Sequence, residues 1–392
     1  MKRMTSMICL LMVFVFVLSA CKNGGDSTTD TKEVKDTVKI AIPAEPTGLD
    51  PQNAEDTNSQ RVLMHVCETL VKLDKDMNYV PGLAKKWEIS DDGLTYTFYL
   101  REGVKAHNGD TLTSEDVKYT IERGAASAKV EKAFRSIDKV EIVDDTTIVL
   151  HLKYVSPVTL GYLSSPSTGI VNKRAAEELG ETEFNKAAVG YGPYKFSEWK
   201  SGARVILKAF DDYYGGKPAI QTAEFVIMTD SNTAAIALEK GEIDLLVEVS
   251  TTDVAKLEAS DNITVYTGDS LIGNLLHMNT QRKPFDDVRV RQAINYAVDK
   301  QAIIDATLDG IGGKTMESYI PEQSLGEKAN TTAYPYDPEK AKNLLKEAGY
   351  EDGFECTIST QQGTNEKIAQ VVKSYLAKVG IKMNIEIYEW GS

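Results

Sequence analysis

Residues 81–124 read PGLAKKWEISDDGLTYTFYLREGVKAHNGDTLTSEDVKYTIERG, and this stretch carries the clearest structural pattern in the chain. Apolar side chains occupy every second position from Leu94 to Leu100, with threonine or tyrosine between them. Such alternation predicts a β-strand with one buried face. The turn residues 91–93, Asp-Asp-Gly, predict that this strand pairs with residues 87–90 in a hairpin.

The same stretch continues into a predicted helix. Thr113 is placed as its N-cap and Asp116 as its third residue, where a carboxylate suits the positive end of a helix. Gly124 is predicted to end this helix. A second hairpin is predicted from residues 140–143 and 147–152.

Strands and helices alternate through the rest of the chain. The first elements are predicted as a strand over 38–42 and a helix carrying Val62, Leu63, Val66 and Leu70, followed later by a helix over 231–240 stopped by Gly241 and a strand over 243–247. Further on, one helix carries the apolar stripe Val290, Ala293, Ile294, Ala297 and Val298, and another is capped by Asp337, with Pro338 first and Gly349 past its end. The chain then forms a predicted β-α-β unit over 354–359, 367–379 and 382–388. This alternation favours open α/β lobes, which bind ligands in crevices near strand ends.

The first twenty residues have the features of a secretory signal peptide. Lys2-Arg3 precede an apolar run over residues 7–18, and Ser19-Ala20 precede Cys21. This cysteine after small residues resembles the bacterial lipobox, in which the thiol receives a diacylglycerol and the peptide is cut just before it. We predict a signal peptide over 1–20 and a lipid-anchored flexible linker over 21–37; a stray cysteine beside an ordinary cleavage site is the alternative.

The charge balance of the exported chain excludes several partners. Residues 1–20 contribute two basic side chains and no acid, so 42 basic and 58 acidic residues remain, a net charge of −16. A chain this acidic has no general attraction for nucleic acid or anionic lipid. Its membrane contact is therefore expected to come from acyl chains on Cys21.

Cysteines and histidines indicate no cofactor site. After Cys21 only Cys67 and Cys356 remain, and we expect two isolated buried thiols, with a disulfide between them as the alternative. No GxxxxGK[ST], HExxH or GxSxG motif is present, so we predict no catalytic, metal or cofactor residue. The four histidines are scattered without metal-ligand spacing: His65, His107, His151 and His277.

The motifs in residues 81–117 resemble the signature region of the extracellular solute-binding proteins of peptide-type ABC importers, family 5. The likeness covers residues 38–392 and departs at Tyr191, where threonine is usual, and after Tyr214, where tryptophan is common. It continues in VGYGPYKF (189–196), YGGKP (214–218), GEID (241–244) and PFDDVRVRQA (284–293). In this family, His107 belongs to the turn after the signature strand, where a structural role is expected.

The resemblance implies a two-lobed, type II periplasmic-binding-protein-like α/β fold with an extra α+β domain. Family members continue past the equivalent of Ser392, so the second lobe is interpreted as incomplete, in a truncated gene or fragment; a natural short variant is the alternative. The predicted boundaries are lobe I over 38–72 and 172–275, the extra domain over 73–171, and lobe II over 276–392.

The resemblance also suggests where a ligand binds. In oligopeptide-binding relatives the loop after the first Leu-Asp-Pro, here residues 49–51, helps line the cleft; this maps onto Glu55, Asp56 and Thr57. Glu55 is predicted to receive a positive ligand group, with the 55–57 backbone pairing with an extended ligand. A solvated acidic loop is the alternative. Asn279 is predicted to lie near the cleft.

The predicted function is a lipid-anchored, monomeric receptor that captures short peptides and presents them to an ABC permease with its ATPase subunits. It is expected on the outer face of the cytoplasmic membrane, on the periplasmic side or cell surface. Alternatives are binding of nickel complexes or sugars, with His277 and Met278 as weak metal candidates, or a peptide-sensing lipoprotein. A surface esterase using Ser270 in a Gly-Asp-Ser-Leu sequence is the least favoured alternative.

Overall fold

The computed structural model describes residues 35–268, 273–308, 312–316 and 333–388. Its contacts divide the chain into residues 1–35 and 36–392, and the architecture below concerns the second unit. The predicted signal peptide and Cys21 lie outside the described residues, and so does Ser270.

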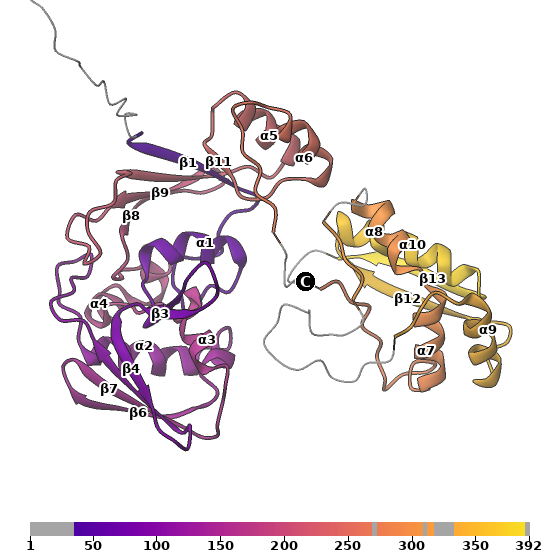
Figure 1. Cartoon of the computed structure of the whole chain (residues 1–392), viewed down its shortest axis with the longest axis horizontal. Helices are drawn as coiled ribbons and strands as arrows, with labels where there is room; N and C mark the ends of the chain where they lie inside the picture. The colour runs from indigo at the N-terminus through magenta and orange to yellow at the C-terminus, as the bar shows by residue number, and fades with distance from the viewer. Residues whose placement is uncertain (1–34, 269–272, 309–311, 317–332, 389–392) are drawn as a thin grey trace, which may run out of the picture. The chain divides into compact units, whose positions relative to one another are not determined.

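A five-stranded mixed sheet contains the first strand of the fold. The strand order is β11-β1-β10-β9-β8, and β1 runs parallel to both of its neighbours (Figure 1). Ile40 of β1 pairs with Phe225 on one side and Leu245 on the other, while β8, β9 and β10 pair antiparallel. The strands are β1 (Thr37–Ile42), β8 (Tyr194–Lys200), β9 (Arg204–Ala209), β10 (Thr222–Ile227) and β11 (Leu245–Leu246).

Helices cover both faces of this sheet, and neighbouring residues of β1 show why. Successive side chains of a strand point to opposite faces. Ile42 belongs to the apolar cluster formed with helices α1 and α4, whereas Ala41 packs with Ala237 of α5. These helices and the one that follows are α1 (Thr57–Val66), α4 (Lys173–Phe184), α5 (Ser231–Glu239) and α6 (Thr251–Glu258).

The signature stretch forms an antiparallel four-stranded sheet in the order β4-β5-β7-β6. The predicted hairpin is confirmed, because Trp87 pairs with Phe98, which is fully buried. The capping box of Thr113 and Asp116 on α2 is also confirmed, as is the second hairpin. The elements are β2 (Val71–Leu73), β3 (Tyr79–Pro81), β4 (Ala84–Ile89), β5 (Thr95–Leu100), α2 (Ser114–Ala126), a 3₁₀ turn (Glu131–Ala133), β6 (Ile137–Asp144), β7 (Thr147–Leu152), α3 (Thr159–Leu163) and a second 3₁₀ turn (Pro166–Thr168).

The ends of helices α1 and α2 differ from the predicted ones. Helix α2 continues past Gly124 to Ala126, and Gly124 instead makes room for a neighbouring ring, since an added Cβ would lie 2.2 Å from Phe134. Helix α1 ends before Leu70, which is buried in the cluster of the four-stranded sheet instead.

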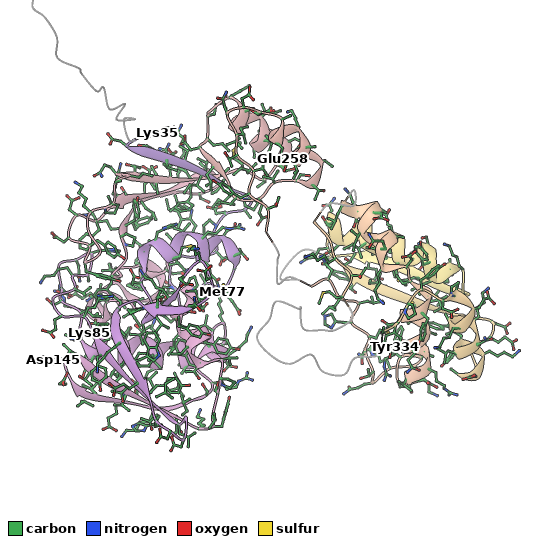
Figure 2. All side chains as sticks on the ribbon, in the orientation of Figure 1. Lys35, Met77, Lys85, Asp145, Glu258 and Tyr334 are labelled. Carbon is green, nitrogen blue, oxygen red and sulfur yellow. The ribbon has the colours of Figure 1, made fainter. Side chains whose placement is uncertain are left out.

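The turn between β2 and β3 brings Met77 to a positive φ of 63° with its side chain exposed (Figure 2).

The carboxyl-terminal part contains the predicted β-α-β unit. Strands β12 and β13 pair in parallel, with Cys356 opposite Met383, and α10 connects them. Asp287 is the N-cap of α7, and the predicted cap Asp337 begins α9. A single apolar cluster joins α7, α9, α10 and both strands. The elements are α7 (Val288–Ala297), α8 (Lys300–Leu308), α9 (Pro338–Glu347), β12 (Phe354–Thr360), α10 (Thr364–Ala377) and β13 (Ile381–Ile387).

None of the helices within the described ranges is long and apolar enough to cross a membrane. The domain boundaries stated above stay predictions.

Candidate ligand-binding site

The carboxyl ends of three parallel strands define the candidate site. Strand β1 lies between β11 and β10, and the helices that follow β1 and β10, α1 and α5, pack on opposite faces of the sheet. Open α/β sheets bind ligands outside such carboxyl ends. The loop over residues 43–56 follows β1, and Glu248 follows β11 by two residues. These segments are the first place to look for ligand-binding side chains.

Asp56, a predicted site residue, is the N-cap of α1. Its carboxylate accepts hydrogen bonds from the Ser59 backbone N–H at 2.9 Å, the Ser59 hydroxyl at 2.6 Å and the Thr47 hydroxyl at 2.5 Å. Burial alone would raise the pKa of Asp56, but these hydrogen bonds outweigh it and hold the pKa below its ordinary value. The carboxylate is therefore ionised and engaged in holding the loop, and Thr57 is the first residue of the helix.

Glu55 is accessible. Its side chain is 49% exposed and pairs with Lys132 Nζ at 2.8 Å, which is also exposed. Exposed pairs of this kind contribute about 0–1 kcal/mol, so a ligand ammonium group can replace the lysine at little cost. The Glu55 carbonyl accepts from Gln60 Nε2 at 3.1 Å. The assignment of Glu55 to ligand binding stays a prediction.

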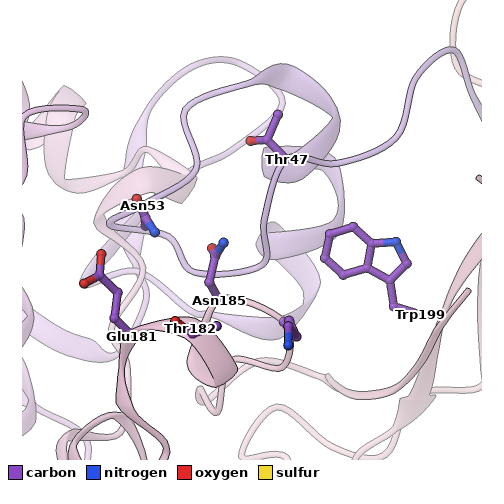
Figure 3. A pocket seen from close by; sticks show the side chains of 7 residues that line it. Thr47, Asn53, Glu181, Thr182, Asn185 and Trp199 are labelled. Atoms are coloured by element: carbon purple, nitrogen blue, oxygen red, sulfur yellow. The ribbon is translucent and has the colours of Figure 1, made fainter. Parts of the chain in front are cut away.

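The loop before Asp56 is held in place by Glu45 and by a close contact at Gly48. The Glu45 carboxylate accepts from the Trp199 indole at 2.8 Å and from the Gly202 N–H at 3.1 Å. An added Cβ on Gly48 would lie 2.1 Å from Asn185 Oδ1, so any other residue here would require the Asn185 side chain to move. A polar hollow of about 370 Å³ lies beside this loop (Figure 3). It is lined by Thr47, Asn53, Glu181, Thr182, Asn185, Lys186 and Trp199.

Arg61 was missed by the sequence analysis. It lies on α1, one and a half turns beyond Asp56, and its guanidinium is held in two directions. Nη1 donates to Asn58 Oδ1 at 2.7 Å, and Nη2 contacts Glu248 Oε1 at 2.6 Å. The three-residue spacing from Asn58 to Arg61 is a visible signal for a local contact on a helix. The pairing with Glu248, 187 residues away, has no local signal.

Asn279, the other predicted site residue, lies in an exposed turn. Its Oδ1 accepts from the Gln281 N–H at 3.0 Å, and its carbonyl accepts from the Arg282 N–H at 3.1 Å. The side chain therefore stabilises its own turn. Its assignment to the cleft stays a prediction.

A second polar group near the loop is buried and structural. Asp50 is fully buried, and its carboxylate is bound by both arms of the Arg123 guanidinium, one of them at 2.7 Å. Gln52 Oε1 accepts from the same arginine at 3.0 Å. Burial alone would lower the pKa of Arg123, but the hydrogen bonds and charge of Asp50 raise it. This network ties α2 to the loop after β1.

The expected structural role of His107 is confirmed. Its Nε2 lies 3.0 Å from the Gly192 carbonyl, and its Nδ1 accepts from the Gly190 N–H at 3.4 Å. This arrangement is that of a neutral imidazole carrying its proton on Nε2. Burial is the main cause that lowers the pKa of His107 to about 4.

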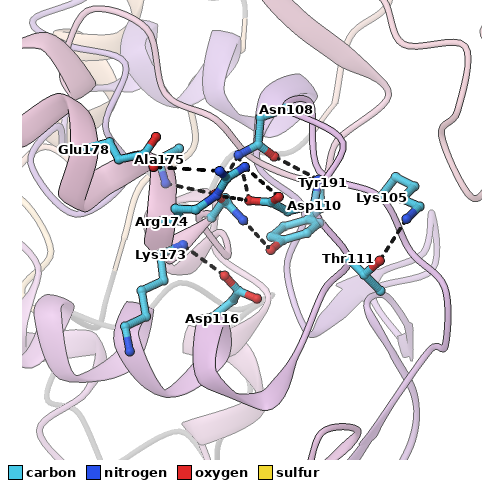
Figure 4. Close-up of polar contacts among 11 residues, drawn as sticks. Lys105, Asn108, Asp110, Thr111, Asp116, Lys173, Arg174, Ala175, Glu178 and Tyr191 are labelled. Atoms are coloured by element: carbon cyan, nitrogen blue, oxygen red, sulfur yellow. Dashed lines mark hydrogen bonds and ion pairs between the residues drawn. The ribbon is translucent and has the colours of Figure 1, made fainter.

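Tyr191, which stands where the family usually has threonine, is accommodated by a neighbouring polar network. Tyr191 is fully buried, and its hydroxyl accepts from Asn172 Nδ2 at 3.4 Å (Figure 4). Asn172 also caps α4, and Asn108 donates to its Oδ1 at 2.9 Å. Two nitrogens of Arg174 bind Asp110 at 2.9 and 2.7 Å. These residues join the signature loops to α4.

No group of three His, Cys, Asp or Glu side chains that could hold a metal ion occurs in the part of the chain that the structure describes. His151 pairs with Glu141 on the surface, and His277 is exposed. Cys67 and Cys356 are both free, as expected, although only Cys67 is fully buried. Burial raises the pKa of the Cys67 thiol far above its ordinary value, so it is unreactive.

Comparison with known proteins identifies relatives of this chain. Residues 78–392 match the bacterial extracellular solute-binding proteins, family 5, middle region. The glutathione-binding protein GsiB of Salmonella typhimurium is 34% identical over 360 residues, which cover 90% of this chain and 70% of that protein.

Solved structures show the same fold. The periplasmic binding protein DppA of Helicobacter pylori, in complex with the peptide STSA, has a TM-score of 0.82 and 33% identity, and covers 91% of this chain and 74% of its own. NikZ of Campylobacter jejuni, in complex with Ni(L-His), has a TM-score of 0.79 and 28% identity, and covers 91% of this chain and 75% of its own.

These matches define the class of protein. The predicted type II periplasmic-binding-protein fold is confirmed, and solved members of this class bind small solutes. The chain belongs to family 5 of the bacterial extracellular solute-binding proteins, the solute-binding components of ABC importers.

Proposed function

We propose that this protein is a lipid-anchored receptor that captures short peptides and delivers them to an ABC permease, whose ATPase subunits hydrolyse ATP. The observation that carries the choice of ligand is the likeness to DppA, whose structure contains a bound tetrapeptide. GsiB, named for glutathione, is also a relative that binds a peptide-like solute. The receptor itself makes and breaks no bonds, and it acts as a monomer.

The arrangement at the carboxyl edge of β1 supports this ligand class. An extended peptide has unpaired backbone groups that a loop can hydrogen-bond independently of side chains. The loop is held in place by Asp56 and Glu45, which limits the entropy lost when a ligand binds. Glu55 is exposed and receives the ligand ammonium in place of Lys132, and Asn279 contributes a polar contact from the second lobe.

Titration calorimetry tests the proposal. The full chain is titrated with an equimolar library of synthetic tripeptides and, separately, with glutathione. We expect saturable binding with a negative heat-capacity change, because apolar surface is buried on closure. Absence of binding to every peptide would contradict the proposal.

Nickel is the second candidate, because NikZ holds Ni(L-His) and His277 is exposed beside Met278. Titration with Ni²⁺ and histidine distinguishes the two ligands. Measuring peptide uptake in cells that lack the gene distinguishes transport from sensing, because uptake falls only if the protein serves transport. The esterase alternative requires ester turnover that disappears in Ser270→Ala.

The anchor is tested apart from the ligand. Cys21→Ser removes the thiol that would receive the diacylglycerol. We expect the wild-type chain in the membrane fraction, on the outer face of the cytoplasmic membrane, and the variant in the soluble fraction. Equal distribution of both would contradict lipid anchoring.

A further inference from the structure

Arg61 and Glu248 form an ion pair at the carboxyl edge of the parallel strands. Arg61 belongs to α1, which begins after the loop from β1, and Glu248 lies two residues beyond β11. The Val247 N–H donates to the Ala41 carbonyl at 3.4 Å, so the segment carrying Glu248 stays beside β1. The pair therefore lies where an open α/β sheet binds its ligand.

The two partners of the Arg61 guanidinium differ in how firmly they are held. Asn58 lies on the same helix and keeps Nη1 in place at 2.7 Å. Glu248 is 57% exposed, against 23% for Arg61, and it binds only Nη2 at 2.6 Å. Arginine is therefore oriented before any ligand arrives, whereas its carboxylate partner is a solvated side chain from another segment.

Such a pair exchanges readily. An ion pair whose carboxylate is exposed contributes little net free energy, because solvent screens that carboxylate and its side chain loses rotamer freedom in the pair. A carboxylate on a ligand offers the same oxygen atoms to the same planar fork. A ligand carboxylate can therefore take the place of Glu248 without leaving Arg61 unpaired.

We propose that Arg61 is the residue that binds a carboxylate of the ligand, and that Glu248 is the internal carboxylate which the ligand displaces. This rests on the proposed function and names the substrate class: solutes with a free carboxylate, such as the carboxyl terminus of a peptide. Glu248 then lowers the affinity for these solutes by competing for Arg61.

The experiment compares one tripeptide library with free carboxyl termini and the same library with carboxyl-terminal amides. Both are titrated into the full chain of the wild type, Arg61→Ala, Arg61→Lys and Glu248→Gln. Arg135→Ala is the matched control, because Arg135 pairs with Glu131 in an exposed contact on the segment between α2 and β6. Thermal melting shows that each variant is folded.

Arg61→Ala should lose about tenfold or more in affinity for the free acids and little for the amides, which is the usual worth of a charge-assisted hydrogen bond. Arg61→Lys should recover part of the loss, and Glu248→Gln should tighten binding of the acids alone. Arg135→Ala should behave as the wild type.

Two results would overturn the inference. If the wild type binds peptides and Arg61→Ala keeps the same ratio of acid to amide affinity, Arg61 does not bind the carboxylate and the proposed function stands. If the wild type binds neither library, the proposed function fails and the inference fails with it.

Discussion

Two arginine–carboxylate contacts near the same loop differ in burial and therefore in role. Arg123 binds Asp50, a carboxylate with no exposed surface, through both arms of its guanidinium. Arg61 binds Glu248 through one arm, and that glutamate is 57% exposed. The residue types are the same, but the first carboxylate cannot return to water without unfolding, whereas the second already lies in water.

This difference separates a structural contact from an exchangeable one. Removing one partner of a buried pair leaves a charge without compensation, while removing one partner of an exposed pair leaves a solvated side chain. The pair of Asp50 and Arg123 therefore holds α2 to the loop after β1, whereas the exposed Glu248 is the partner of Arg61 that we propose a ligand displaces.

The largest expected effect is that of Arg123→Ala. We expect a loss of about 3–5 kcal/mol in the free energy of unfolding, because Asp50 stays buried without its countercharge. Urea denaturation followed by circular dichroism measures it. Arg135→Ala, at an exposed pair, should change stability by less than about 1 kcal/mol. Equal effects of the two substitutions would contradict the distinction drawn from burial.

His107 extends the comparison to a buried group that titrates. Its pKa is about 4 in the folded protein against 6.5 for the ordinary group, so the unfolded chain binds the extra proton first. Its contribution is fully present above pH 6.5, is lost as the pH falls toward 4, and then levels off. When the pH falls from 7 to 5, we expect this residue to lower the free energy of unfolding by about 2 kcal/mol.

Urea denaturation of the wild type and of His107→Gln at both pH values isolates the contribution of His107 to the pH dependence of stability. The glutamine keeps hydrogen-bonding capacity and carries no titrating proton, so the variant should lose less stability on acidification. An identical loss in both proteins would show that His107 contributes nothing to the pH dependence.

Asp56 is intermediate, being a half-buried helix cap. Asp56→Ala removes the acceptor for Ser59 and Thr47 and should lower the free energy of unfolding by about 1 kcal/mol. Asp56→Asn, which keeps a capping oxygen, is the matched control and should recover most of the loss. Chemical denaturation of the two variants gives the comparison; a fully stable Asp56→Ala would mean that the cap is dispensable.

The smallest expected effect is that of Glu248→Gln. Glu248 is exposed and contacts only one nitrogen of Arg61, which keeps Asn58 as a partner, so stability should change by less than about 0.5 kcal/mol. A loss of 2 kcal/mol or more in denaturation would assign this pair to the structure of the protein and remove the contrast with Asp50–Arg123.

Much of the fold could be predicted because its patterns are local. The alternation from Leu94 to Leu100 and the capping box at Thr113 depend on neighbours within a few residues, and each strand and helix of the β-α-β unit near the carboxyl end has its own local pattern. The errors arose where a distant residue decided the outcome. Gly124 lies within α2 and not at its end, and Phe134 occupies the space that a side chain there would fill.

The candidate site was predicted only in part. The loop over residues 55–57 was placed by resemblance, yet the different roles of its two acids were not predicted. Asp56 is held by Thr47 and Ser59, while Glu55 remains exposed, and local sequence does not distinguish two adjacent carboxylates. Arg61 was missed because its partner is 187 residues away.

Periodicity and capping residues predicted the helices, the strands and the caps, since these patterns follow from backbone geometry, and the resemblance of the motifs indicated the family and its fold. Only the tertiary structure decided which charges are buried and which are exchangeable. Burial depends on how distant segments pack, and the dielectric environment that packing creates sets the worth of each charge. Arg61 and Arg123 are the same type of residue, but the carboxylate partner of Arg61 is exposed and that of Arg123 is buried, so the two contacts differ in role.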